Sequence, residues 1–212
     1  INSDIYFEGV PSVEKRKQNS GFFFHACKDV PEIRKIFFDL IKTLDCSFEA
    51  VVARKIPAIF ERKHHRQEKL FYADLLSHLL KDKLETEGRL ILNIAERGTS
   101  TKNQNLENAL KMAVERHVFS NKLRNKNIEV KRKISFNVQT PLTEPLLNVV
   151  DYLCWSIQRV FEKGEVRFYN YLQEKISLVV DLYDAENYAG RRNYYTKDNP
   201  LTTGNKISPH LH

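Results

Sequence analysis

Runs typical of strands alternate with runs typical of helices along most of this chain, and that order limits its possible folds more than any other feature. Four apolar, β-branched runs read as strands, at 47–56, 89–96, 127–138 and 176–183. Four patterns with helical spacing follow or separate them, at 66–88, 100–119, 140–161 and 165–174. This order predicts an α/β domain with helices packed on a mixed central sheet.

Two further strands and a helix are expected nearer the N-terminus. The aromatic runs 3–9 and 20–27 are bounded by Gly, Pro and polar residues, as strands usually are. A helix is predicted over 31–43, because Asp29 stands at a plausible N-cap with Glu32 three residues later, a capping-box pattern. Strand 89–96 is almost continuously apolar, which predicts burial on both faces.

Length and composition predict one large domain with an appendage. The 212 residues are 42% hydrophobic, enough for a substantial core. We expect the domain to span 1–184, and the polar, tyrosine-containing segment 185–212 to be an extended tail that lies on its own domain or on a partner protein. The sequence opens with Ile1, and Met112 is its single methionine, so we expect natural residues upstream of Ile1.

The location that we expect is the cytoplasm. No window approaches the roughly 18 to 20 apolar residues that cross a membrane, and the start has no basic and apolar leader pattern, so we expect neither secretion nor membrane insertion. Cys27, Cys46 and Cys154 are widely spaced and stand in apolar runs. They are expected to be small buried residues in a reducing compartment, and not a disulfide or zinc framework.

Charge favours a polyanionic partner without requiring one. The formal net charge is +7 and the pI is about 9.2. Basic residues gather in the run 121–133, where they could follow nucleic acid phosphates: Lys122, Arg124, Lys126, Lys131, Arg132 and Lys133. A solvated loop with an edge strand protected by lysines explains the run equally well. Near the C-terminus, "RRNYY" could stack bases or anchor the tail.

Several common catalytic patterns are absent from the sequence. It contains no Gly-rich phosphate loop, no GxGxxG, no GxSxG and no HExxH. The adjacent His64 and His65 point to different sides of a helix and have no ligand at metal-binding spacing, so an exposed basic helix start is the simpler interpretation. Nucleotide-cofactor enzymes and serine hydrolases are therefore disfavoured.

Two carboxylates stand apart from the general charge background. Glu96 is the last residue of the run 89–96, just past its apolar part, at the carboxyl end where ligands gather in open α/β sheets, although a solvated residue paired with Arg97 would look the same. Asp151 falls at the rim of the apolar face of helix 140–161, where it either serves a site or bonds Trp155, Gln158 or a nearby Arg. If the two converge, they suit Mg²⁺ or Mn²⁺, which could promote phosphodiester cleavage.

The stretch "FNVQTPLTEPLLNVVDYLCWSIQRVFEKGEVRFYNYL" resembles the closing motif of the "domain of unknown function 3800" family, which has a ribonuclease-H-like fold. The matching positions are Val149, Val150 and Asp151, followed by Trp155, Arg159, Glu162 and Gly164. Looser similarity extends back through "LILNIAERG" to "GFFFHACKDVPEIRK" and covers 1–184. The family's Asp-Glu-Ser-Gly-like turn after the first strand is missing, so Glu8 substitutes for it or the acidic residue lies upstream of Ile1.

The resemblance implies a ribonuclease-H-like mixed sheet with an acidic metal site. Asp151 would be the acidic residue of the last core helix, Glu96 that of a central strand and Glu8 a weak third. The function that follows is a nuclease dependent on Mg²⁺ or Mn²⁺, held on nucleic acid by the basic run, with a setting in prokaryotic defence or mobile-element biology. The alternative is a catalytically inactive ribonuclease-H-like subunit that binds nucleic acid or docks a partner protein.

Overall fold

The chain forms two compact units, each assembled from segments that are distant in the sequence. The computed structural model describes residues 11, 13–14, 23–85, 87–123, 132–184, 190 and 192–207. Unit 1 draws on Ile1–Phe48, Thr140–Ser177 and Thr196–His212, and unit 2 on Glu49–Gln139 and Leu178–Tyr195. The boundary predicted at residue 184 therefore does not separate compact bodies, because unit 2 runs through it.

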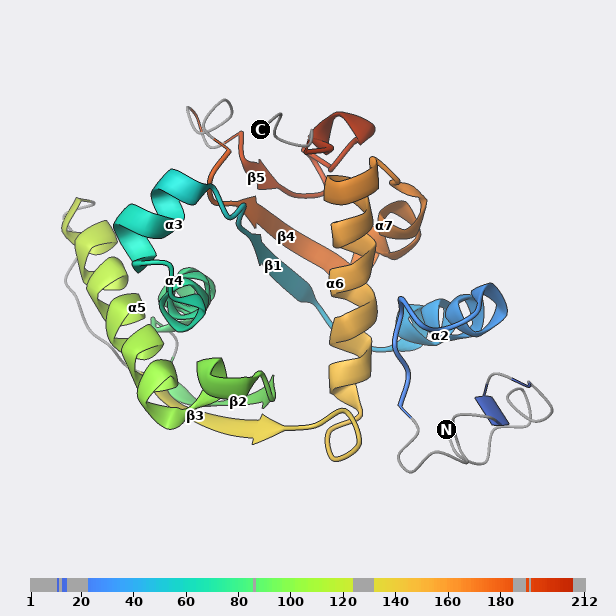
Figure 1. Ribbon diagram of the computed structural model, residues 1–212, viewed down its shortest axis with the longest axis horizontal. Helices are drawn as coiled ribbons and strands as arrows, with labels where there is room; N and C mark the ends of the chain where they lie inside the picture. Colours follow the sequence, from blue (N-terminus) through green and yellow to red (C-terminus); the bar gives the residue numbers. More distant parts are fainter. Residues whose placement is uncertain are drawn as a thin grey trace. The chain divides into compact units, whose positions relative to one another are not determined.

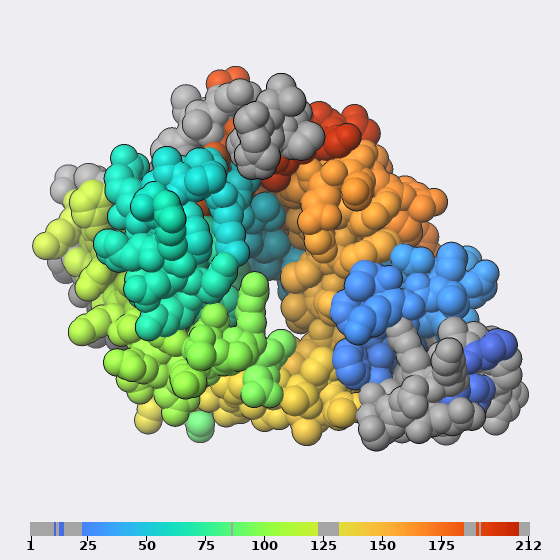
Figure 2. All heavy atoms as spheres, viewed as in Figure 1, coloured from blue at the N-terminus to red at the C-terminus, as the bar shows by residue number. Residues whose placement is uncertain are grey.

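Unit 1 is built from helices around an aromatic core. Its main elements are α2 (Pro31–Thr43), α6 (Leu146–Lys163), α7 (Arg167–Leu172), η4 (Gln173–Lys175) and η6 (Thr203–Asn205). Figure 2 shows the atoms of α2, in light blue, against those of α6 and α7, in orange. Phe37 and Tyr152 meet in the core with ring centroids 4.3 Å apart, and both are almost fully buried. Burial of such large side chains is the main stabilising contribution to a helical unit.

The helix boundaries in unit 1 follow from local sequence signals. Helix α2 has the predicted bounds, with Pro31 in its first turn. Helix α6 ends at Gly164, whose φ of 68° is a left-handed conformation that closes the last turn. Its N–H donates to the carbonyl of Val160 at 2.8 Å. The predicted helix 140–161 therefore exists, but it begins six residues later, after the turn at 141–143.

A mixed sheet of three strands lies mostly in unit 2. Its order is β1 (Phe48–Val52), β4 (Ile176–Asp181) and β5 (Tyr194–Tyr195). The Ser177 hydroxyl donates to the carbonyl of Phe48, and the Leu182 N–H donates to the carbonyl of Val52. Because both residue numbers rise together, β1 and β4 run in the same direction, whereas β5 is antiparallel to β4. Strand β5 falls in the predicted tail, and Tyr195 is only 5% exposed. This part of the tail is therefore a component of the sheet (Figure 1).

The second sheet of unit 2 is a parallel pair, β2 (Gly88–Ala95) and β3 (Arg132–Gln139), in continuous register. Helices α4 (Glu68–Leu80) and α5 (Asn103–Leu123) pack on it (Figure 1), preceded by α3 (Pro57–His64) and accompanied by η2 (Lys81–Lys83) and η3 (Gly98–Thr101). Leu80, Leu84 and Ala113 form the buried contact with the sheet residues Leu92, Ile134 and Phe136. The architecture is thus mixed α/β, as predicted.

Burial of β2 differs from the prediction. Its residues alternate between exposed and half-buried, and Ile91 is 50% exposed. The reason is that the helices pack against one face of the pair, through residues such as Leu92, so the alternate side chains receive no such cover. A continuous apolar run indicated the strand correctly, but it did not indicate burial on both faces.

Three other predictions are corrected by the structure. Residues 23–27 form no strand: the carbonyl of His25 accepts the N–H groups of Lys28 and Asp29, which makes a turn. His64 is 2% exposed and is not part of an exposed helix start. The three cysteines are free thiols, as expected, but they are exposed and not buried.

In the part of the chain that the structure describes, no helix has the length and apolar character to cross a membrane.

His64 is buried because it joins a charged network around Asp74 of α4. The Asp74 side chain is 1% exposed, and its carboxylate contacts Lys63 Nζ at 2.8 Å, His64 Nε2 at 3.0 Å and the Arg116 guanidinium. The Tyr183 hydroxyl donates to it at 3.0 Å. Burial alone would raise the pKa of Asp74, but the hydrogen bonds from Lys63 and His64 outweigh it and hold the pKa at about 2. The network joins α3, α4, α5 and the end of β4.

Removal of the Asp74 charge should therefore destabilise unit 2. Because Asp74→Asn removes the carboxylate that Lys63 and Arg116 share, and the pKa of that carboxyl lies well below its ordinary value, we expect a loss of about 2–3 kcal/mol in unfolding free energy at pH 7. The depressed pKa makes the stabilisation complete above the ordinary value of 3.8 and lost as the pH falls toward about 2. Urea unfolding of the wild type should show that loss, and the variant should not.

Asp82→Asn is the matched control, since the Asp82 side chain is 74% exposed and its ion pair with Lys81 spans 3.9 Å. A surface pair of this kind should change the unfolding free energy by less than about 1 kcal/mol. Equal effects of the two substitutions would contradict a stabilising role for the buried network.

Candidate functional site

Asp151 lies at the rim of α6, as its helical position predicts. Its side chain is 38% exposed, and Oδ2 accepts the backbone N–H of Ala26 at 2.8 Å. The same oxygen lies 3.3 Å from Nδ1 of His25. Neither partner is one that the sequence suggested, and Gln158 bonds Glu162 instead. Asp151 therefore holds the 25–29 turn while keeping part of its carboxylate accessible.

The next residue of α6 holds the same turn from the core side. The Tyr152 hydroxyl donates to Asp29 Oδ2 at 2.5 Å, and the His25 N–H donates to that oxygen at 2.8 Å. Tyr152 is fully buried, and burial together with the Asp29 carboxylate raises the pKa of its hydroxyl. Asp29 is thus not the predicted N-cap of α2. That position belongs to Val30, and the Asp29 carboxylate serves the turn.

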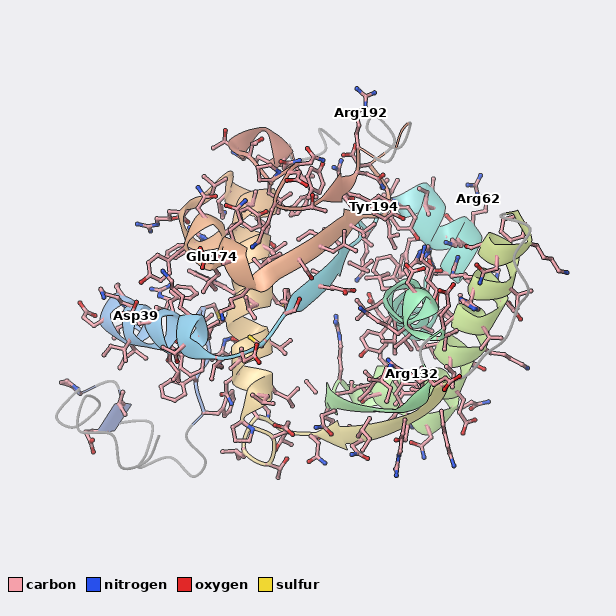
Figure 3. All side chains as sticks on the ribbon, turned by 180° about the vertical axis from the view of Figure 1, so that it is seen from behind. Asp39, Arg62, Arg132, Glu174, Arg192 and Tyr194 are labelled. Atoms are coloured by element: carbon pink, nitrogen blue, oxygen red, sulfur yellow. The ribbon has the colours of Figure 1, made fainter. Side chains whose placement is uncertain are left out.

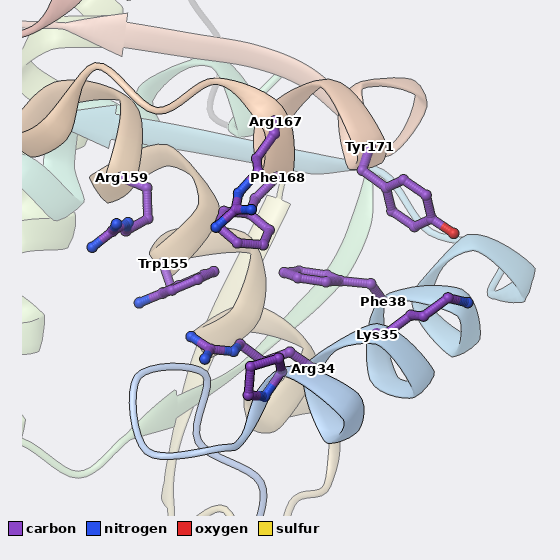
Figure 4. Close-up of a pocket in the computed structure, with 9 residues that line it drawn as sticks. Arg34, Lys35, Phe38, Trp155, Arg159, Arg167, Phe168 and Tyr171 are labelled. Carbon is purple, nitrogen blue, oxygen red and sulfur yellow. The ribbon is translucent and has the colours of Figure 1, made fainter.

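A pocket of about 490 Å³ opens in unit 1 beside the same helix (Figure 4). Helices α2, α6 and α7 supply its aromatic and cationic lining, together with Pro31: Arg34, Lys35, Phe38, Trp155, Arg159, Arg167, Phe168 and Tyr171. Trp155 and Phe168 have ring centroids 4.6 Å apart, and Phe38 lies 5.6 Å from Phe168. The pocket therefore has an aromatic wall with cations around it.

Guanidinium groups lie over the rings of this wall. Arg34 is 5.1 Å and Arg159 is 5.6 Å from the centroid of Trp155, and Arg167 is 4.4 Å from that of Phe168. These distances are typical of cation–π contacts. Figure 4 shows Arg34 on the α2 side of Trp155, and Arg159 and Arg167 entering from α6 and α7.

Ion pairs fix most of the pocket cations. Arg159 and Arg167 share the carboxylate of Glu165, with Arg159 Nε 2.6 Å from Oε2, and these pairs lower the pKa of Glu165 against the opposing effect of burial. Lys35 pairs with Asp39 at 2.8 Å, and Asp39 lies on the same helix, α2, where Figure 3 labels it. Arg34 has no ion pair with a residue of the described ranges, and its contact is with the Trp155 ring. Arg34 is consequently the cation most available to an anionic ligand.

Glu96 continues the end of β2 in unit 2. Its N–H donates to the carbonyl of Gln139 at 2.9 Å, which extends the β2–β3 pairing by one residue. The side chain is exposed, and the neighbouring Arg97 lies over the ring of Tyr72 at 5.8 Å. Glu96 belongs to unit 2 and Asp151 to unit 1, so the convergence of the two carboxylates stays a prediction.

The described part of the basic run begins at the end of α5 and resumes on β3. Lys122 is exposed on the last turn of α5, Arg132 begins β3 (Figure 3), and Lys133 is exposed beside it. The exposed Arg89 is the register partner of Lys133 on β2, a neighbour that the sequence did not reveal. Arg124, Lys126, Lys131 and the predicted third carboxylate Glu8 lie outside the described residues.

Metal binding would have to draw on few protein ligands. Within the described ranges, no group of three or more His, Cys, Asp or Glu side chains could hold a metal ion. Mg²⁺ nevertheless binds many sites through one or two carboxylates, several waters and substrate phosphates. Asp151 fits that limited requirement, because its contacts to Ala26 and His25 use Oδ2 and its side chain is partly exposed.

The aromatic pocket was missed from the sequence, although a signal for it exists. Trp155 and Arg159 follow Asp151 at intervals of four residues, so the three share one stripe of α6. The sequence also showed the "RFY" run that supplies Arg167, Phe168 and part of α7. What it could not show was that α2 would place Arg34 and Phe38 against that stripe.

The contact between Tyr152 and Asp29 should be measurable as stability. Tyr152→Phe keeps the ring in the core but removes the hydrogen bond to a buried carboxylate, so we expect a loss of about 1–3 kcal/mol in unfolding free energy. The matched control is Tyr171→Phe, because Tyr171 is 43% exposed and bonds the partly exposed Asp39. Chemical denaturation of both variants makes the comparison, and equal losses would show that the buried turn contact contributes no more than the exposed one.

Comparison with known proteins gives no relative for this chain. No protein-family model, no curated protein and no solved structure matches it. The chemistry of the site is therefore argued from the chain's own residues, above all from the Asp151 carboxylate and the cationic aromatic pocket on one stripe of α6.

Proposed function

We propose that the chain is a ribonuclease-H-like protein that binds nucleic acid and cleaves its phosphodiester bonds with Mg²⁺ or Mn²⁺. One observation carries the proposal: a partly exposed carboxylate, Asp151, shares a stripe of α6 with Trp155 and Arg159, which line the pocket of unit 1. Trp155 and Arg159 lie one and two turns beyond Asp151, at about 5.4 Å of helix rise per turn. The stripe thus offers an acidic group beside a surface suited to a polyanion.

Asp151 is the residue that would hold the metal ion. The Ala26 N–H fixes the orientation of its Oδ2, and fixed orientation is what a metal-binding carboxylate requires. Glu96 and Glu8 are the further carboxylates proposed for the complete site. When bound, a divalent ion would lower the pKa of its water and offset the charge that develops on the leaving oxygen. The protein itself would orient the carboxylate and bind the nucleic acid backbone.

Cations of both units are proposed to hold that backbone. Arg34 contributes in unit 1, and Lys122, Arg132 and Lys133 contribute in unit 2, where Arg89 adds a further charge. Arg124, Lys126 and Lys131 of the same run belong to this proposal as well. Each phosphate contact releases a counterion, so affinity should fall steeply as salt is raised.

A catalytically inactive ribonuclease-H-like subunit is the second candidate. It is favoured by the structural contacts of Asp151 with Ala26 and His25, since a carboxylate that holds a turn needs no metal to explain it. Such a subunit would bind nucleic acid or a partner protein. Docking through Tyr194 and Tyr195 is disfavoured, because these two residues already form β5.

Cleavage assays with Asp151→Asn separate the two candidates. The asparagine oxygen can still accept the Ala26 N–H, so the fold should persist while metal affinity falls. For labelled RNA and DNA with Mg²⁺ or Mn²⁺, we expect the variant to cleave about 100-fold more slowly and to bind as tightly as the wild type. Asp198→Asn is the control, because Asp198 is exposed and belongs to the same unit.

The remaining outcomes count against the assigned metal ligand, against one candidate or against both. Equal cleavage by the wild type and Asp151→Asn would exclude Asp151 as a metal ligand. Salt-sensitive binding without cleavage would favour the inactive subunit, and the absence of both binding and cleavage would contradict both candidates.

A further inference from the structure

We infer that the pocket of unit 1 is a binding site for one nucleoside phosphate, with the base on the aromatic wall of Trp155 and Phe168 and the phosphate on Arg34. The inference deepens the proposed function and rests on it for the source of the ligand. The pocket is a different site from the Asp151 carboxylate, although α6 contributes residues to both.

The size and composition of the pocket select this class of ligand. Its volume of about 490 Å³ falls within the usual range for small-molecule sites. Three arginines and a lysine favour an anion, and four aromatic side chains favour a planar ring. A small inorganic anion would leave the rings without contact, whereas an uncharged aromatic ligand would leave the cations without a partner. A nucleoside phosphate satisfies both groups.

Arg34 occupies the position that a base would take. Its guanidinium lies 5.1 Å from the centroid of Trp155, a planar group resting on an aromatic ring. Stacking of a nucleic acid base on an aromatic side chain is stronger than an exposed cation–π contact. Entry of a base should therefore displace the guanidinium, and the displaced group is then free to form a charge-assisted hydrogen bond with the phosphate.

The other arginines are not suited to the same exchange. Glu165 binds both Arg159 and Arg167, so movement of either guanidinium would break an ion pair. They are expected to keep their positions and to frame the base. Arg34 lies on α2, a helix of thirteen residues. Asp151 and Tyr152 hold the turn that precedes this helix, so the backbone that carries the phosphate-binding side chain is fixed in position.

Fluorescence of the single tryptophan of the chain tests the inference directly. Trp155 is that residue, and a stacked base should quench its emission. We expect saturable quenching by AMP and by UMP with the full-length chain. Adenosine should bind at least tenfold more weakly, and ribose 5-phosphate and inorganic phosphate should not quench.

Arg34→Gln provides the variant. It should weaken the binding of AMP about tenfold and leave that of adenosine within about twofold, because the substitution removes the phosphate contact and not the aromatic wall. Arg62→Gln is the matched control: Arg62 is exposed on α3 of unit 2 (Figure 3), and its loss should change neither. Circular dichroism of both variants should match that of the wild type, since Arg34 is only half-buried.

The outcomes separate this inference from the proposed function. Quenching by AMP without any cleavage of nucleic acid supports the pocket and removes the nuclease. Binding or cleavage of oligonucleotides with unchanged Trp155 emission overturns the pocket and leaves the nuclease standing. Equal quenching by AMP and ribose 5-phosphate also overturns it, because no base would then be stacked. Tighter quenching by a short oligonucleotide than by AMP identifies a strand, and not a free nucleotide, as the source of the ligand.

Discussion

The attachment of the 25–29 turn to α6 is the contact on which the arrangement of unit 1 depends. Asp151 and Tyr152 are consecutive, so on a helix they point about 100° apart, one to the rim and one to the core. Asp151 accepts the N–H of Ala26, and Tyr152 bonds Asp29, so the turn is held from both sides. Because α2 begins at Pro31, directly after this turn, the same contacts set the position of Arg34 and of the pocket's α2 wall.

Asp151 therefore combines two roles in one side chain, a structural contact with the 25–29 turn and the proposed binding of a metal ion. Its Oδ2 is used to hold a turn, and its partial exposure is what makes a metal-ligand role attractive. The pocket presents the opposite case, because its arginines rest on rings and on Glu165 and do not depend on Asp151 for their charge balance. The proposed recognition of nucleic acid can therefore be argued from unit 1 by itself, whereas the proposed catalysis also draws on Glu96 of unit 2 and on Glu8.

The sequence predicted well where local chemistry decides the outcome. Helix α2 has the predicted bounds because Pro31 and the apolar spacing act within the helix, and β2 lies within a residue of its predicted run. Prediction from the sequence failed where a residue distant in the chain determines the local structure. Residues 23–27 resemble a strand but turn, because Asp151 and Asp29 take their N–H groups. His64 is buried because of Asp74, and the pocket needs three helices, so neither could be derived from one segment.

The interleaving of the two units has a consequence for synthesis. A ribosome completes Glu49–Gln139 of unit 2 while unit 1 still lacks α6, α7 and the last segment. Unit 1 closes late, since Leu201 is 3% exposed and the Ile207 N–H donates to the carbonyl of Phe161 at 2.7 Å. The aromatic side chains of α2 therefore stay exposed in the nascent chain until α6 and α7, more than a hundred residues later, have been made. During that time a chaperone could protect them from aggregation.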